Sequence, residues 1–91
     1  MIAGPAATPV TPMQLVGARI RDLRIAHGMT QGALATQCCV HQVTVSEWER
    51  GLKIPSWIGK PSNRDLLSGA LGLPVTVLFR EVLDDDGSRA A

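Results

Sequence analysis

The chain has 91 residues, of which 45% are hydrophobic, and a formal net charge of +1. This length predicts a single domain with a modest core, and the hydrophobic content argues against a disordered chain. The sequence has no apolar run of about eighteen residues and begins without the basic and apolar regions of a signal peptide, so we expect a cytoplasmic protein with no membrane span.

The first expected element is a helix that follows an uncharged, flexible arm over residues 1–10. Thr11 is a suitable N-cap, Pro12 suits the first helical position, and Gln14 completes a capping box. Gly28 is a natural stop. The buried face of this helix is predicted from spacings of four, three and four residues, which select Val16, Ile20, Leu23 and His27.

Two short helices are expected next, close together in the segment 30–51. Thr30 is an N-cap candidate for a helix over about 31–37, whose last turn reaches Cys38. A third helix over about 42–50 ends at Gly51. The side chains expected to face the core from these two helices are Leu34, Ala35, Val45 and Trp48.

A loop and a fourth helix follow. Two prolines and a glycine predict a loop over residues 52–61, and Ser62 is a good N-cap for the helix after it. We expect Gly72 to end that helix. Its predicted apolar face consists of Leu66, Leu67, Ala70 and Leu71.

The segment 74–83 is ambiguous between helix and strand. The β-branched residues at 75–77 favour a strand, but apolar residues at helical spacing and a proline at the start favour a helix, which we prefer. Its apolar face is a candidate dimer interface, and the alternative is packing onto the first and fourth helices. The residues concerned are Val75, Leu78, Phe79 and Val82, with Leu83 next to them.

The charges are distributed unevenly. Residues 1–64 contain seven basic and three acidic side chains, whereas residues 65–91 contain two basic and five acidic ones, including an acidic tail expected to be disordered over 84–91. This asymmetry is compatible with nucleic-acid binding, although scattered basic residues also occur on ordinary helices.

The remaining chemistry argues against a catalytic or metal site. Cys38 and Cys39 are adjacent, which does not suit an unstrained disulfide, so we expect two reduced thiols. With His27 and His41 they lack the spacing of a zinc site. The sequence has no Ser-His-Asp set, no paired carboxylates at catalytic spacing and no phosphate-binding loop. We therefore expect no enzyme, cofactor, metal or small-molecule ligand.

Three segments carry a family resemblance: "IRDLRIAHGMTQGALA", "VTVSEWERG" and "LLSGALGL". Through these segments, the region 13–79 resembles the helix-turn-helix domain of the bacteriophage repressor and Cro-like (XRE-type) family. The resemblance implies an all-α fold, a compact bundle of four to five helices of the lambda-repressor-like type over residues 11–83. It also implies a DNA-binding transcriptional regulator with its helix-turn-helix at 30–51.

The resemblance places the third helix in the major groove of double-stranded DNA, with its exposed residues toward the base edges. Glutamine can pair with adenine, valine and threonine methyl groups can contact thymine, and glutamate can accept from cytosine. The expected base-reading residues are Gln42, Val43, Thr44 and Glu47.

Other residues are expected to hold the DNA backbone or the domain itself. The family pairs the position of Arg24 with that of Glu49 in an ion pair, and by analogy Gln31 braces Gln42. The start of the second helix also favours a phosphate. The expected phosphate contacts are Gln31, Ser46, Arg50, Lys53 and Lys60.

Two departures from the family pattern are present. Cys39 stands where the family commonly has glycine in a left-handed conformation, which is strained for other residues. We therefore expect the backbone of this turn to differ from that of the family. The loop 52–61 is longer than in short phage repressors. It carries Trp57, which we expect to cover the edge of the core, with a DNA backbone or a partner as the alternatives.

The leading interpretation is therefore a sequence-specific regulator of repressor or Cro-like type, acting at the nucleoid of a prokaryotic or phage-infected cell. We expect it to bind a palindromic operator as a homodimer. The alternative is an antitoxin-like interaction module that binds a protein through its C-terminal apolar face.

Overall fold

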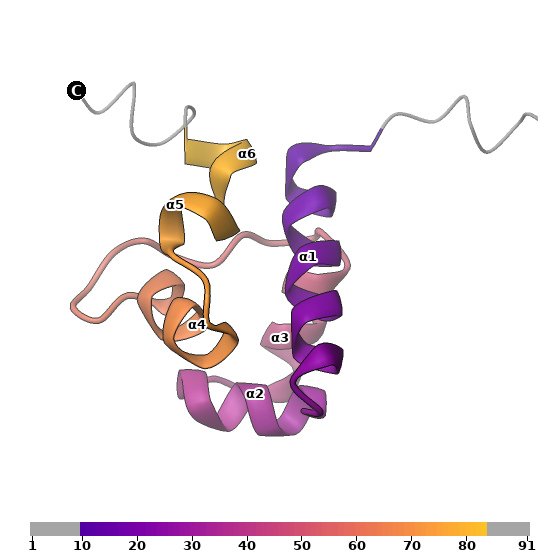
Figure 1. The fold of residues 1–91 in the computed structure, drawn as a ribbon, viewed down its shortest axis with the longest axis vertical. Coiled ribbons are helices and arrows are strands. Elements are labelled where there is room, and N and C mark those ends of the chain that lie inside the picture. The colour runs from indigo at the N-terminus through magenta and orange to yellow at the C-terminus, as the bar shows by residue number, and fades with distance from the viewer. Residues whose placement is uncertain (1–9, 84–91) are drawn as a thin grey trace, which may run out of the picture.

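A computed structural model describes residues 10–83 of the chain, so most of the expected arm and the whole acidic tail lie outside the described residues. Six helices and no strand occur within this range (Figure 1). None of them is long and apolar enough to cross a membrane. Their bounds are α1 Pro12–Ala26, α2 Gln31–Cys38, α3 Gln42–Glu49, α4 Asn63–Leu71, α5 Val75–Leu78 and α6 Arg80–Leu83.

Local sequence fixes where the helices begin. The hydroxyl of Thr11 accepts from the backbone N–H of Gln14 at 3.1 Å, and the Gln14 side chain accepts in return from the Thr11 N–H at 2.9 Å. Ser62 forms a second capping box at the start of α4, and Thr30 caps α2. These side chains satisfy N–H groups that have no partner inside the helix, which confirms the three predicted starts.

The core lies between α1 on one side and α4 on the other, with α3 packed against α1 and α2 packed against α3 and α4 (Figure 1). α1 and α3 touch backbone to backbone, because a Cβ placed on Gly17 would overlap the carbonyl oxygens of Trp48 and Glu49. The buried apolar residues are Val16, Ile20, Leu34, Ala35, Cys38, Val45, Trp48, Leu67, Leu71, Leu78, Phe79 and Val82.

The segment 74–83 is helical, as preferred, but it forms two short turns rather than one continuous helix. Leu78 and Phe79 are fully buried and Val82 is 6% exposed, while Val75 packs against the same core. The apolar face therefore packs within its own chain, which is the alternative to the expected dimer interface. In this conformation Leu78, Phe79 and Val82 offer almost no surface to a partner.

An ion pair attaches these short helices to α1. The Arg19 guanidinium contacts the Glu81 carboxylate and also donates to the Leu78 carbonyl at 2.9 Å. Hydrogen bonding from Arg19 lowers the pKa of Glu81 to about 2. Because this pKa lies below the ordinary value of 4.5, the pair stabilises the fold at neutral pH, and its contribution is lost as the pH falls from about 4.5 toward 2.

The loop 52–61 lies between α3 and α4 and extends beyond α4 (Figure 1). Its middle is anchored, since Pro55 is buried and its carbonyl accepts from the Nε of Arg64 at 2.9 Å. Trp57, in contrast, is 56% exposed. The expectation that Trp57 covers the edge of the core is wrong, because the chain turns inward at the buried Pro55 and is exposed again at Trp57.

Candidate nucleic-acid interface

α3 has one side in the core and one side in solvent. Val45 is fully buried and Trp48 is 3% exposed, so these two side chains hold the helix to the domain. Gln42 and Val43, at its N-terminal end, are exposed, Val43 at 65%. Thr44 is half-buried. The helix therefore displays its first turn outward.

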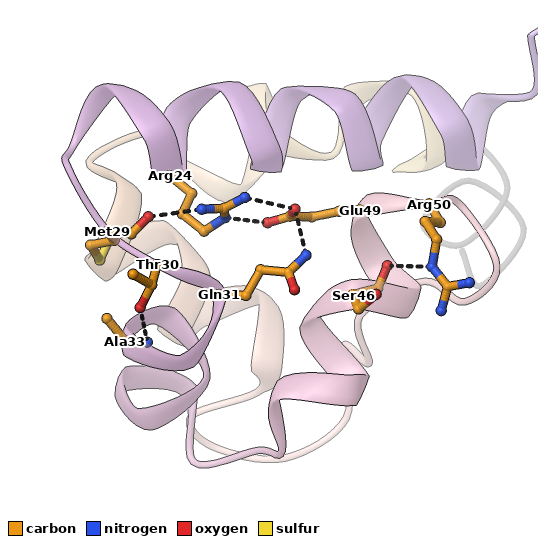
Figure 2. A network of polar contacts seen from close by, with 8 residues as sticks. All are labelled: Arg24, Met29, Thr30, Gln31, Ala33, Ser46, Glu49 and Arg50. Carbon is orange, nitrogen blue, oxygen red and sulfur yellow. Dashed lines mark hydrogen bonds and ion pairs between the residues drawn. The ribbon is translucent and has the colours of Figure 1, made fainter.

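A buried network fixes the orientation of α3 (Figure 2). Arg24 of α1 forms a two-pronged ion pair with Glu49 of α3, with distances of 2.6 Å from Nε to Oε2 and 3.1 Å from Nη2 to Oε1. The same guanidinium donates to the Met29 carbonyl at 2.8 Å. The hydrogen bond to Glu49 raises the pKa of Arg24, so the guanidinium stays charged. This confirms the expected ion pair.

Gln31 completes this network. Its side-chain amide donates to Oε1 of Glu49 at 3.0 Å, so α1, α2 and α3 meet at one carboxylate. The expected bracing of Gln42 by Gln31 is not observed among the described residues, where the Gln31 side chain bonds to Glu49 instead. Gln42 instead extends along the start of α2, where its Oε1 would lie 3.7 Å from a Cβ added at Gly32.

The outer edge of α3 continues into the loop that follows. The backbone N–H groups of Leu52 and Lys53 both donate to the Glu47 carbonyl, at 2.9 and 3.4 Å. The Lys53 ammonium lies 3.7 Å from the Glu47 carboxylate, and Arg50 donates from Nε to the Ser46 carbonyl at 3.3 Å. Glu47 thus meets the solvent already paired with a lysine.

The turn between α2 and α3 keeps the geometry expected for a glycine. Cys39 has φ 58° and ψ 40°, in the left-handed region. Its N–H donates to the Thr36 carbonyl, and the Val40 N–H donates to the Ala35 carbonyl at 3.0 Å. This pair of bonds is a Schellman motif. The expected reshaping of the turn is therefore not observed.

The cysteines show no feature of a metal site. Cys38 and Cys39 are free thiols, and burial raises the pKa of Cys38 to about 11, which disfavours its thiolate. Within residues 10–83, no three His, Cys, Asp or Glu side chains are grouped closely enough to hold an ion.

One buried cation was not recognised from the sequence. Arg64 is 2% exposed and lies over the Phe79 ring, with 4.9 Å from its guanidinium carbon to the ring centre. Counted only as a basic residue, it looked like part of the solvated surface. Its spacing of three and seven residues from Leu67 and Leu71 places it on the buried face of α4, and that spacing could have identified it.

Two short helices with a fixed crossing, one of them held by the core and exposed at its first turn, define a helix-turn-helix protein. A family model described as helix-turn-helix matches residues 20–56. No curated protein matches the chain.

Several solved structures are similar over most of their length. The restriction-modification controller protein C.AhdI from Aeromonas hydrophila is 31% identical, with a TM-score of 0.64 over 74% of this chain and 96% of that one. The DNA-binding domain of the P22 C2 repressor is 35% identical, with a TM-score of 0.64 and coverages of 78% and 88%. The clp gene regulator ClgR from C. glutamicum is 29% identical, with a TM-score of 0.68 and coverages of 82% and 91%.

The chain belongs to the helix-turn-helix family and is a DNA-binding transcriptional regulator. Its all-α fold is of the lambda-repressor-like type, as the resemblance implied.

Proposed function

We propose that the chain binds a specific DNA site by placing α3 in the major groove. The observation that carries this proposal is the contrast along α3. Val45 and Trp48 are buried and Glu49 is tied to α1 and α2, whereas the first turn is free to contact DNA. A helix held this rigidly can read base edges without losing conformational freedom on binding.

The base-reading roles follow from side-chain chemistry and position. Gln42 is exposed at the start of α3 and suits the paired donor and acceptor of adenine. Val43 and the Thr44 methyl group suit the thymine methyl. Glu47 can accept from cytosine N4, but it must then share its carboxylate with Lys53. We therefore assign the main reading to Gln42 and Val43.

Phosphate contacts position the domain on the duplex without reading sequence. The side chain of Gln31 is occupied by Glu49, so its contribution is its backbone N–H at the start of α2. Lys53 and Lys60 are exposed at the two ends of the loop. With these residues, Ser46 and Arg50 complete the proposed backbone contacts.

We infer that two copies bind a palindromic operator, since a single reading helix contacts only a few base pairs. Leu78, Phe79 and Val82 do not provide the dimer contact, because they are buried within one copy. Because Leu78 is buried, replacing it with a charged residue would destabilise the fold and so would not test association. The burial of these three residues gives the antitoxin-like alternative little support. Light scattering with and without DNA measures the number of copies.

Replacing Gln42 tests the reading role. We expect Gln42→Ala to weaken binding to the selected site by about 1–3 kcal/mol and to relax the base preference at one position. The measurement is selection of duplexes from a random pool, followed by titration of the selected duplex and of random DNA.

Gln37→Ala is the matched control, because it removes an exposed amide from α2 instead of α3. Lys53→Ala is expected to weaken all duplexes alike and to lower the slope of log affinity against log salt by about 1. Equal losses of Gln42→Ala on selected and random DNA would reject Gln42 as a base reader.

A further inference from the structure

The loop 52–61, which follows α3, exposes large apolar side chains. Leu52 is 59% exposed, Trp57 56% and Ile58 73%. Trp57 and Ile58 are consecutive and form what we call the loop tip. Single exposed apolar residues are ordinary, but an adjacent tryptophan and isoleucine on one projecting loop is a feature of contact surfaces.

The loop tip is supported by a fixed stem, which consists of Pro55 and Ser56 bonded to Arg64. Arg64 donates from Nε to the Pro55 carbonyl at 2.9 Å, and its backbone N–H donates to the Ser56 carbonyl at 3.3 Å. The Ser56 hydroxyl in turn accepts from the Ile58 N–H at 3.1 Å. The residues on both sides of Trp57 are therefore bonded, and the tip projects from an ordered base.

The charge around the tip identifies its partner. From Arg50 to Asn63 the chain has three exposed cations, Arg50, Lys53 and Lys60, and no acidic residue. The loop also begins on α3 itself, through the bonds from residues 52 and 53 to the Glu47 carbonyl. Lysines on both sides of an apolar tip suit a polyanion that has apolar sugar surfaces between its charges, which is DNA.

We propose that the loop tip packs against the deoxyribose backbone of the DNA bound by α3, while Lys53 and Lys60 contact the phosphates on either side. This contact supplies affinity without reading bases, and it rests on the proposed function. Arg64 is a positioning residue for it, because it fixes the stem and does not reach the surface.

Tryptophan fluorescence tests the contact directly. The chain has two tryptophans, and Trp48 is 3% exposed, so a neutral quencher such as acrylamide reports mainly on Trp57. The probe is a random-sequence duplex of roughly 30 base pairs, about three helical turns, at low salt. The variant Trp57→Phe has only Trp48 and gives the quenching of a buried tryptophan. We expect saturating DNA to lower the acrylamide quenching of the intact chain to the value of this variant.

Affinity gives the second measurement. We expect Trp57→Ala to weaken binding roughly five- to tenfold on selected and random duplexes alike, with the salt slope unchanged, because an apolar contact releases no counterions. Val77→Ala is the matched control, since it removes an exposed apolar side chain from α5, and it should bind as the intact chain does.

The outcomes separate this proposal from the proposed function. If DNA binds and acrylamide still quenches Trp57 as strongly as in the free protein, the loop contact is overturned and the proposed function is not. Protection that appears with rising protein concentration in the absence of DNA assigns the tip to a second copy and also overturns it. A chain that binds neither duplex overturns both proposals.

Discussion

The ends of α2 and α3 have the same backbone structure built from different residues. After α3, Gly51 has φ 74°, and its N–H and that of Leu52 donate to the Trp48 and Glu47 carbonyls at 3.1 and 2.9 Å. After α2, Cys39 has φ 58° and makes the equivalent bonds to Thr36 and, through Val40, to Ala35. Both are Schellman motifs with a left-handed residue.

The space around these two residues differs. A Cβ on Gly51 would lie 2.7 Å from Cγ and 2.9 Å from Cα of Gln14, in the first turn of α1. Cys39 has a side chain that is exposed to solvent. Glycine is therefore required after α3 by both conformation and space, whereas after α2 only conformation favours it, and the motif tolerates a cysteine.

The largest effect is expected from Gly51→Ala. The methyl group adds overlap with the α1 backbone to the left-handed strain, which together destabilise the fold by roughly 2–5 kcal/mol. Urea unfolding followed by circular dichroism measures the change. A loss below about 1 kcal/mol would show that α1 and α3 can separate here without penalty, and the comparison would fail.

Gly28→Ala is the intermediate case. Gly28 also ends a helix in the left-handed region, with φ 71°, but a Cβ there would meet nothing within 4 Å. Only the conformational strain remains, so we expect a loss of about 1 kcal/mol in the same unfolding experiment. If Gly28→Ala and Gly51→Ala cost the same, space would not be what distinguishes the two sites.

The smallest effect, with the opposite sign, is expected from Cys39→Gly. Removing the side chain relieves strain of about 1–2 kcal/mol in the folded state. The greater conformational entropy of the unfolded chain offsets about 0.4–1 kcal/mol of this gain. We expect the variant to be more stable by roughly 0.5–1 kcal/mol and to bind DNA unchanged. Cys39→Ala is the control and should match the parent. A destabilised Cys39→Gly would show that the thiol makes a contact of its own.

Features with a local cause could be read from the sequence. The capping residues Thr11, Thr30 and Ser62 start helices where expected, because each bonds to a backbone N–H three residues further on. The Arg24–Glu49 pair came from the family resemblance instead, and its two-pronged geometry confirms it. The proposed reading residues remain predictions, because their partner is DNA.

Features with a distant cause were missed or misjudged. Gln31 was expected to reach Gln42 but bonds to Glu49, because Oε1 of the buried carboxylate accepts a second hydrogen bond beside the one from Arg24. Trp57 was expected at the core edge but points outward, since Pro55 and Arg64 occupy the inner position. Both outcomes depend on which polar atoms are available after the helices have packed.

The sequence by itself determined the first four helices, their order and the caps of α1, α2 and α4, because these depend on residues within one or two turns of each other. Only the tertiary structure decided that Trp57 remains at the surface and that Gln31 bonds to Glu49. Leu78 and Phe79 are buried where Arg19 of α1 bonds to the Leu78 carbonyl, and the loop tip is exposed while Arg64 bonds to its base at Pro55. These outcomes depend on contacts between residues far apart in the sequence, and a local sequence pattern carries no information about such contacts.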